Sequence, residues 1–217
     1  TGLSAIKIDN PQSVSSRKSC VDMGGYVMAA SPDGLLRIVQ NQITVDTQAF
    51  FTLPQWQTYS PSTLRGYFYE GIYIGFSSTK AFMFDTRQSV STVTTLSGFP
   101  TIVGGYNDLA TDTLYLVAST GLIYTWETGT NASYTWKSKP IRVANPTTPA
   151  CGRIWATGNV AIQLWADGTS VYGPVTIANN EVFRLPAGYR AKEFQLQLTG
   201  SHTVEAVSIA NSIAELS

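Results

Sequence analysis

Few residues in this chain have the types and spacing that chemistry requires. His202 is the only histidine among 217 residues, and it stands in Gly200-Ser201-His202-Thr203, a sequence typical of a turn between strands. A zinc site needs several Cys or His ligands at close spacing, which His202 lacks. A catalytic role would need a Ser or Cys nucleophile brought to the imidazole by the fold. We therefore expect His202 to be an exposed turn residue, with catalysis as the alternative.

Two carboxylates lie close enough in sequence to suggest acid–base chemistry. Asp108 and Asp112 could serve glycoside hydrolysis, in which one acid is protonated and the other is ionised. Their oxygens could also hold a calcium ion. Both stand among Gly, Asn and Thr, and Asp is common at such positions because its carboxylate bonds nearby backbone amides. The sequence favours turn and strand-entry residues here and leaves a hydrolase and a calcium site as alternatives.

Cofactor and nucleic-acid binding have little support in the sequence. The doublets Gly24-Gly25 and Gly104-Gly105 stand before predicted strands and lack the lysine and helix of a phosphate-binding loop. The 14 basic residues balance 14 acidic ones, and the nearest basic cluster is small: Lys137, Lys139 and Arg142. Because a polyanion binder needs a positive field, we expect no nucleic-acid partner. We also expect no cofactor and no enzyme activity.

Aromatic residues make up 12% of the chain and are the best candidates for contacts. They could form a sugar-binding platform or a protein interface, although most aromatic residues of a β-rich fold lie in its core. The residues considered are Trp56, Tyr59, Trp126, Trp136, Trp155 and Trp165.

Short β-type runs must position these residues. Runs rich in Val, Ile, Tyr, Phe, Trp and Thr alternate with Gly, Pro, Asp and Asn, which predicts an all-β fold with tight turns. Hydrophobic residues are 43% of the chain, enough for a large core. In the first part of the chain, the predicted strands are Tyr26 to Ala30, Leu35 to Val39, Gly66 to Tyr69, Ile72 to Phe76, Ala81 to Asp85, Leu114 to Ala118 and Leu122 to Glu127.

A weak repeat runs through these first strands. A strand ends in Ala or Phe before a Ser, then come a polar turn and a second apolar strand, and Ser31, Ser78 and Ser119 mark the three copies. Their spacing of about 40 to 50 residues is typical of propeller blades. The sequence predicts an incomplete set of about three blades, because a closed propeller has at least about four.

The strands become denser from Trp136 onwards. Phe194, Leu196 and Leu198 alternate with polar residues, as in a strand with one buried face. This density predicts a β-sandwich-like region at 135–217 that follows propeller-like blades at 1–134. Its expected strands are Trp136 to Val143, Gly152 to Thr157, Ala161 to Ala166, Ser170 to Ile177, Val182 to Leu185, Glu193 to Thr199 and Val204 to Ala210.

The expected compartment is a reducing one without a membrane span. Two cysteines, Cys20 and Cys151, are too few for a disulfide framework. No run approaches the roughly 18 consecutive apolar residues of a membrane span, and Thr1-Gly2-Leu3-Ser4 does not begin a signal pattern.

An ordered set of segments spans nearly the whole chain. It comprises Cys20-Val21-Asp22, Tyr26 to Leu35, Phe51 to Trp56, Tyr59-Ser60-Pro61, Tyr69 to Tyr73, Tyr134 to Lys139, Phe183 to Ala191 and Ala206 to Leu216. This set resembles the later part of the propeller-bearing tail proteins of bacteriophages. In those proteins such segments build a tail nozzle, knob or stabilising collar from blades and an appended sandwich, and a longer amino-terminal part precedes them.

The resemblance implies a non-enzymatic virion protein of the tail, assembled in the host cytoplasm. Its expected partners are other tail proteins and further copies of itself. The alternative is a carbohydrate- or receptor-binding module at the tail tip, with a host surface glycan as its ligand. The interface residues that we expect are Trp56, Tyr59, Trp136, Lys137 and Lys139.

Overall fold

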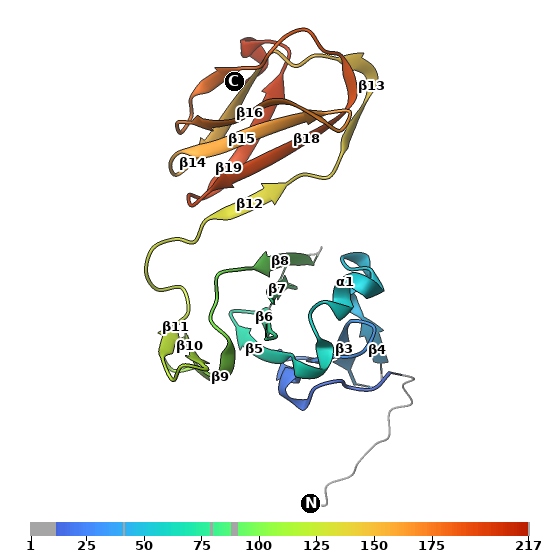
Figure 1. The fold of residues 1–217 in the computed structure, drawn as a ribbon, viewed down its shortest axis with the longest axis vertical. Helices are drawn as coiled ribbons and strands as arrows, with labels where there is room; N and C mark the ends of the chain where they lie inside the picture. The colour runs from blue at the N-terminus through green and yellow to red at the C-terminus, as the bar shows by residue number, and fades with distance from the viewer. Residues whose placement is uncertain (1–11, 41, 79, 88–90, 217) are drawn as a thin grey trace, which may run out of the picture. The chain divides into compact units, whose positions relative to one another are not determined.

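The computed structural model describes residues 12–40, 42–78, 80–87 and 91–216. Strands account for 52% of the structure and helices for 10%, so the prediction of an all-β fold is confirmed. The chain divides into two compact units, Thr1–Thr128 and Gly129–Ser217 (Figure 1). The division falls a few residues before the expected boundary at 134.

Three antiparallel sheets, each connected in simple up-and-down order, form the first unit. The first sheet has β1 (Val21–Asp22), β2 (Val27–Ala30), β3 (Leu35–Val39) and β4 (Gln42–Val45). The second has β5 (Arg65–Tyr69), β6 (Ile72–Phe76), β7 (Ala81–Asp85) and β8 (Thr92–Leu96). The third has β9 (Ile102–Asp108), β10 (Thr113–Ala118) and β11 (Ile123–Thr125). Short helices connect them: η1 (Arg17–Ser19), η2 (Asp46–Ala49), α1 (Leu53–Gln57) and η3 (Pro61–Thr63).

The first and second sheets have the same turn after their second strands, β2 and β6. The amide of Ser31 donates to the carbonyl of Gly34, and the amide of Ser77 donates to that of Lys80, each at 2.8 Å. Each serine hydroxyl donates to the same carbonyl as its amide. Ser77, not Ser78, is therefore the residue equivalent to Ser31, and the repeat expected at Ser78 was wrong by one position. Ser119 follows β10 in the same way, although its amide donates to Thr101.

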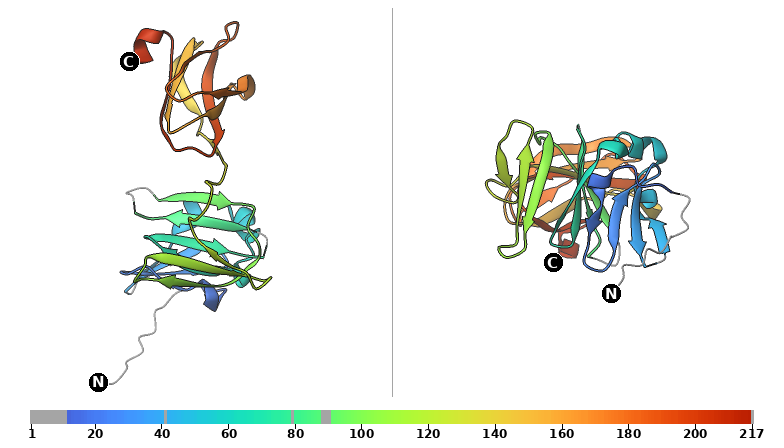
Figure 2. Two further views of the ribbon diagram at one scale, coloured as in Figure 1. Left: turned by 90° about the vertical axis from the view of Figure 1, so that its left-hand side faces the viewer. Right: turned by 90° about the horizontal axis from the view of Figure 1, so that it is seen from below.

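The second sheet is buried on both of its faces. Successive side chains of a strand point to opposite sides, so Tyr73 packs with the first sheet while Ile74 packs with the third. On the neighbouring strand Phe82 and Phe84 face the first sheet, and Ala81 faces the third. The three sheets stand side by side in the right-hand view of Figure 2, and the first strands β1, β5 and β9 contact one another in sequence.

Trp56 and Tyr59 belong to the core between the first and second sheets. The helix that carries Trp56 begins at a capping box, in which Thr52 and Gln55 bond each other's backbone amides. The indole of Trp56 donates to the carbonyl of Ser31 at 2.9 Å, and its ring meets Phe82 edge-on. Trp56 is 1% exposed and Tyr59 is 5% exposed, so neither side chain offers a surface to a partner. Their selection as interface residues was wrong.

Two sheets that share one core form the second unit. We call them the wide sheet and the narrow sheet. The wide sheet contains β12 (Tyr134–Lys137), β13 (Ile141–Thr147), β15 (Val160–Ala166), β16 (Thr169–Ile177) and β18 (Ala191–Gly200). The narrow sheet contains β14 (Cys151–Ala156), β17 (Val182–Arg184) and β19 (Val204–Ala210), and the helix η4 (Ile213–Leu216) follows it.

The single strand expected from Trp136 to Val143 is interrupted. β12 and β13 both pair with the same edge of β18, but the pairing breaks between Lys137 and Ile141. Pro140 lies in this break, where its missing amide hydrogen removes a ladder bond. β12 and β13 thus occupy one position at the edge of the wide sheet.

Replacing Trp56 by alanine should destabilise the first unit by about 3–5 kcal/mol, because it opens a cavity and leaves a buried carbonyl unpaired. Leu53→Ala in the same helix is the control, since Leu53 is exposed and its loss should cost less than about 0.5 kcal/mol. Urea unfolding measures both values, and equal losses would contradict the core assignment.

Candidate functional site

The outer face of the third sheet carries large apolar side chains, two of them strongly exposed and two half-buried. Tyr115 pairs with Tyr106, and Val117 pairs with Ile123, so these four side chains lie on one face. Tyr106 is 66% exposed and Ile123 is 68% exposed. Exposed aromatic and β-branched residues gathered on one face mark a site of protein contact. We call these four residues the outer face of the third sheet.

The opposite face of the same sheet is fully packed. Leu114 and Leu116 are buried against the second sheet. Gly105 lies within β9 on this face, and a Cβ there would come within 2.6 Å of the Tyr67 ring. The glycine therefore allows close approach of β9 to β5, and the placement of Gly104-Gly105 ahead of a strand was wrong. The third sheet thus has one covered face and one open face.

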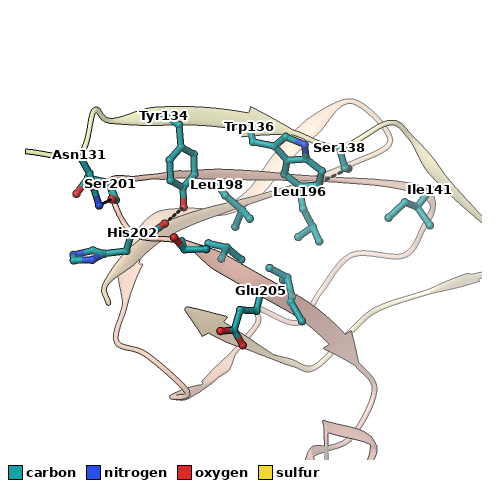
Figure 3. Close-up of a pocket in the computed structure, with 14 residues that line it drawn as sticks. Asn131, Tyr134, Trp136, Ser138, Ile141, Leu196, Leu198, Ser201, His202 and Glu205 are labelled. Atoms are coloured by element: carbon teal, nitrogen blue, oxygen red, sulfur yellow. Dashed lines mark hydrogen bonds between the residues drawn. The ribbon is translucent and has the colours of Figure 1, made fainter. Parts of the chain in front are cut away.

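A cleft of about 730 Å³ opens in the second unit. Figure 3 shows Trp136 reaching from β12 into the space above β19, with Leu196 and Leu198 of β18 beneath it. Trp136 is 51% exposed and Ile141, further along the same edge, is 49% exposed. Both pair with inward-facing residues of β18, so they lie on the core side of the wide sheet and yet remain uncovered.

The end of the cleft near the β18–β19 turn is polar. The hydroxyl of Tyr134 donates to the carbonyl of His202 at 2.9 Å, and the amide of Asn131 donates to that of Ser201 at 3.2 Å (Figure 3). Burial raises the pKa of Tyr134 above its ordinary value. Glu205 lines the cleft from β19 and is exposed. None of the ion pairs found among the described residues involves this carboxylate.

The basic residues near β12 do not form one patch. Lys137 follows Trp136 and points to the opposite face, where its ammonium lies 3.9 Å from the centre of the Trp165 ring. Arg142 pairs with Glu193 at 2.9 Å, and Lys139 is exposed in the break before β13. Of the five expected interface residues, only Trp136 lines the cleft.

The residues weighed for catalysis lie in turns or at a strand end. Asp108 ends β9 and its carboxylate accepts from the amide of Ala110 at 3.0 Å, while Asp112 precedes β10 with a φ of 50°. His202 stands in the turn between β18 and β19, and its ring covers Gly158. The turn prediction is confirmed for Asp112 and His202, whereas Asp108 is the last residue of β9 and pairs with Thr113.

Within the part of the chain that the structure describes, no group of three or more His, Cys, Asp or Glu is placed to hold a metal ion. The thiols of Cys20 and Cys151 are both free. No described helix is long and apolar enough to cross a membrane.

Comparison with known proteins does not assign this chain to a family. No family model matches this chain, and no curated protein matches it significantly.

Both candidate surfaces depend on residues that the sequence did not single out. Ile123 and Tyr106 lie in strands whose pattern did not reveal which face is covered. Ile141 and Glu205 sit at sheet edges, where exposure depends on the strands of the facing sheet. One signal could have indicated an open face. The strands β9–β11 belong to the last of the three repeated sheets, and they carry apolar residues on both faces although no further sheet follows them in the repeat.

Trp136 should dominate the solvent-accessible tryptophan emission, because it is the only one of the five tryptophans that is exposed. Trp136→Phe is expected to remove most of the emission that acrylamide quenches, and Trp56→Phe should leave that fraction unchanged. Equal accessible fractions in the two variants would show that the cleft is closed in solution.

Proposed function

We propose that this chain is a non-enzymatic structural protein of a bacteriophage tail, part of a nozzle, knob or collar, and that it works by presenting β surfaces to neighbouring subunits. In this proposal the first unit is an incomplete set of three propeller-like blades and the second is a β-sandwich. The ordered motif set is the feature of the sequence that favours the tail.

The outer face of the third sheet is the observation that carries the proposal. The first two sheets each bury a face against the next sheet along the chain, but Tyr106, Tyr115, Val117 and Ile123 have no such neighbour. Radially arranged sheets close into a ring only when the last one meets a partner. A neighbouring subunit of the tail is the partner that we propose for this face.

The sheet arrangement supports the blade assignment. The up-and-down order of each sheet is that of a blade, and the contacts between β1, β5 and β9 put the first strands together, as around an axis. For the second unit, the packing of the wide and narrow sheets on one core supports a sandwich.

Ile123→Asp should weaken self-association or association with tail partners, because it places a charge where the partner sheet would bury it. The dissociation constant is expected to rise at least about tenfold, or about 1.4 kcal/mol. Leu53→Asp is the matched control, an exposed leucine on α1 and away from the third sheet. Light scattering over a concentration series measures self-association. If both variants and the native chain show the same mass distribution and bind purified tails equally, the outer face of the third sheet is not the interface.

The assignment to a tail is tested by the composition of particles. Mass spectrometry of purified tails of the phage that encodes this sequence should find the chain in a fixed ratio to the other tail proteins. Tails that infect normally without it would exclude the proposal.

A second function is binding of a host surface carbohydrate, and the exposed indole of Trp136 beside the polar end of the cleft is the observation in its favour. A glycan array tests it. Binding that Trp136→Ala abolishes would support this function, and no signal above background would exclude it.

A further inference from the structure

The two sheets of the second unit differ by one strand position. The wide sheet has four positions in the order β12/β13, β18, β15 and β16, because β12 and β13 share one edge of β18. The narrow sheet has three, in the order β19, β14 and β17.

Short connections fix which strands face each other across the core. Residues 157–159 join β14 to β15, residues 178–181 join β16 to β17, and residues 201–203 join β18 to β19. A connection this short between two packed sheets leaves its strands on opposite sides of the core at the same position. Every strand of the narrow sheet therefore has a partner in the wide sheet, in matching order. Among the residues that the structure describes, no strand lies opposite β12/β13.

The missing strand leaves apolar side chains of β12 and β13 exposed to solvent. Sheets that pack face to face stand about 10 Å apart, so the space left by one missing strand is a groove lined by apolar side chains. Trp136 and Ile141 face this space and remain half exposed, while Leu196 and Leu198 beneath them are buried.

One wall of the groove is an unpaired strand edge. β19 pairs with β14 on one side and has no partner strand among the described residues on the other. Alternate residues of an edge strand present their backbone amides and carbonyls outwards, which makes the edge a template for another strand. A sugar or a helix would leave most of this row of donors and acceptors unpaired, whereas a strand satisfies it.

We propose that the cleft binds an extended strand of another polypeptide, which pairs with the free edge of β19 and completes the narrow sheet. Its inward side chains are apolar at alternate positions and cover Trp136 and Ile141. A Lys or Arg of the incoming strand lies near Glu205, the exposed carboxylate of β19 that lines the groove. β19 has 7 residues, Val204–Ala210, and sets the length of the paired segment.

This cleft lies within the second unit and is separate from the outer face of the third sheet. The proposal of a strand-binding site therefore does not depend on the proposed role in a tail.

A synthetic nine-residue peptide, with valine alternating with threonine and one central lysine, is the probe. The control peptide has the same sequence with all of its peptide amides N-methylated, so it keeps the side chains but loses the backbone donors. Saturable binding should shift the Trp136 emission to shorter wavelength, and N-methylation should weaken it at least about tenfold. Hydrogen exchange should slow at alternate amides of β19 when the unmodified peptide is bound.

Variants of the whole chain locate the binding. Ile141→Asp and Glu205→Lys should each weaken the peptide at least about tenfold, by burying a charge and by reversing the attraction for lysine. Val175→Asp, on the opposite edge strand β16, should leave binding unchanged. Absence of saturable binding, equal affinity for the N-methylated peptide, or unchanged exchange in β19 would each overturn the proposal.

Discussion

The packing of the second sheet on both of its faces is the interaction on which the first unit depends. Tyr73 and Phe82 face the first sheet, whereas Ile74 and Phe76 face the third, so this sheet holds the other two. Each large side chain buried in this way contributes about 1.5–3 kcal/mol. The same rule of facing sheets identifies the two surfaces where a partner is missing, because an apolar sheet face is stable in water only when it is covered.

The strands were predictable where short apolar runs are bounded by strong turn residues. β3, β6 and β7 begin and end at the expected residues. β4 and β8 were missed because Gln42–Val45 and Thr92–Leu96 are edge strands with mostly polar or half-exposed side chains. β9 was missed because its two glycines suggest a turn, although Gly105 serves the close approach of Tyr67.

The candidate surfaces were much less predictable than the strands. Trp56 and Trp136 are alike in sequence terms, since both are tryptophans in polar surroundings, but one fills the core and the other stands half exposed. The difference arises from long-range packing: α1 folds back over the first two sheets, and β12 extends past the last strand of the narrow sheet. No local pattern records how many strands the facing sheet contains, so the cleft and the outer face emerge only from the arrangement of whole sheets.

The central proposal is that the outer face of the third sheet is covered by another polypeptide, which we propose to be a neighbouring subunit of a phage tail. Hydroxyl-radical footprinting of the free chain and of purified tails measures this directly, because tyrosine and isoleucine side chains are modified only where solvent reaches them. We expect strong modification of Tyr106 and Ile123 in the free chain and strong protection of both in the tail. Equal modification of these two residues in the free chain and in the tail would contradict the account.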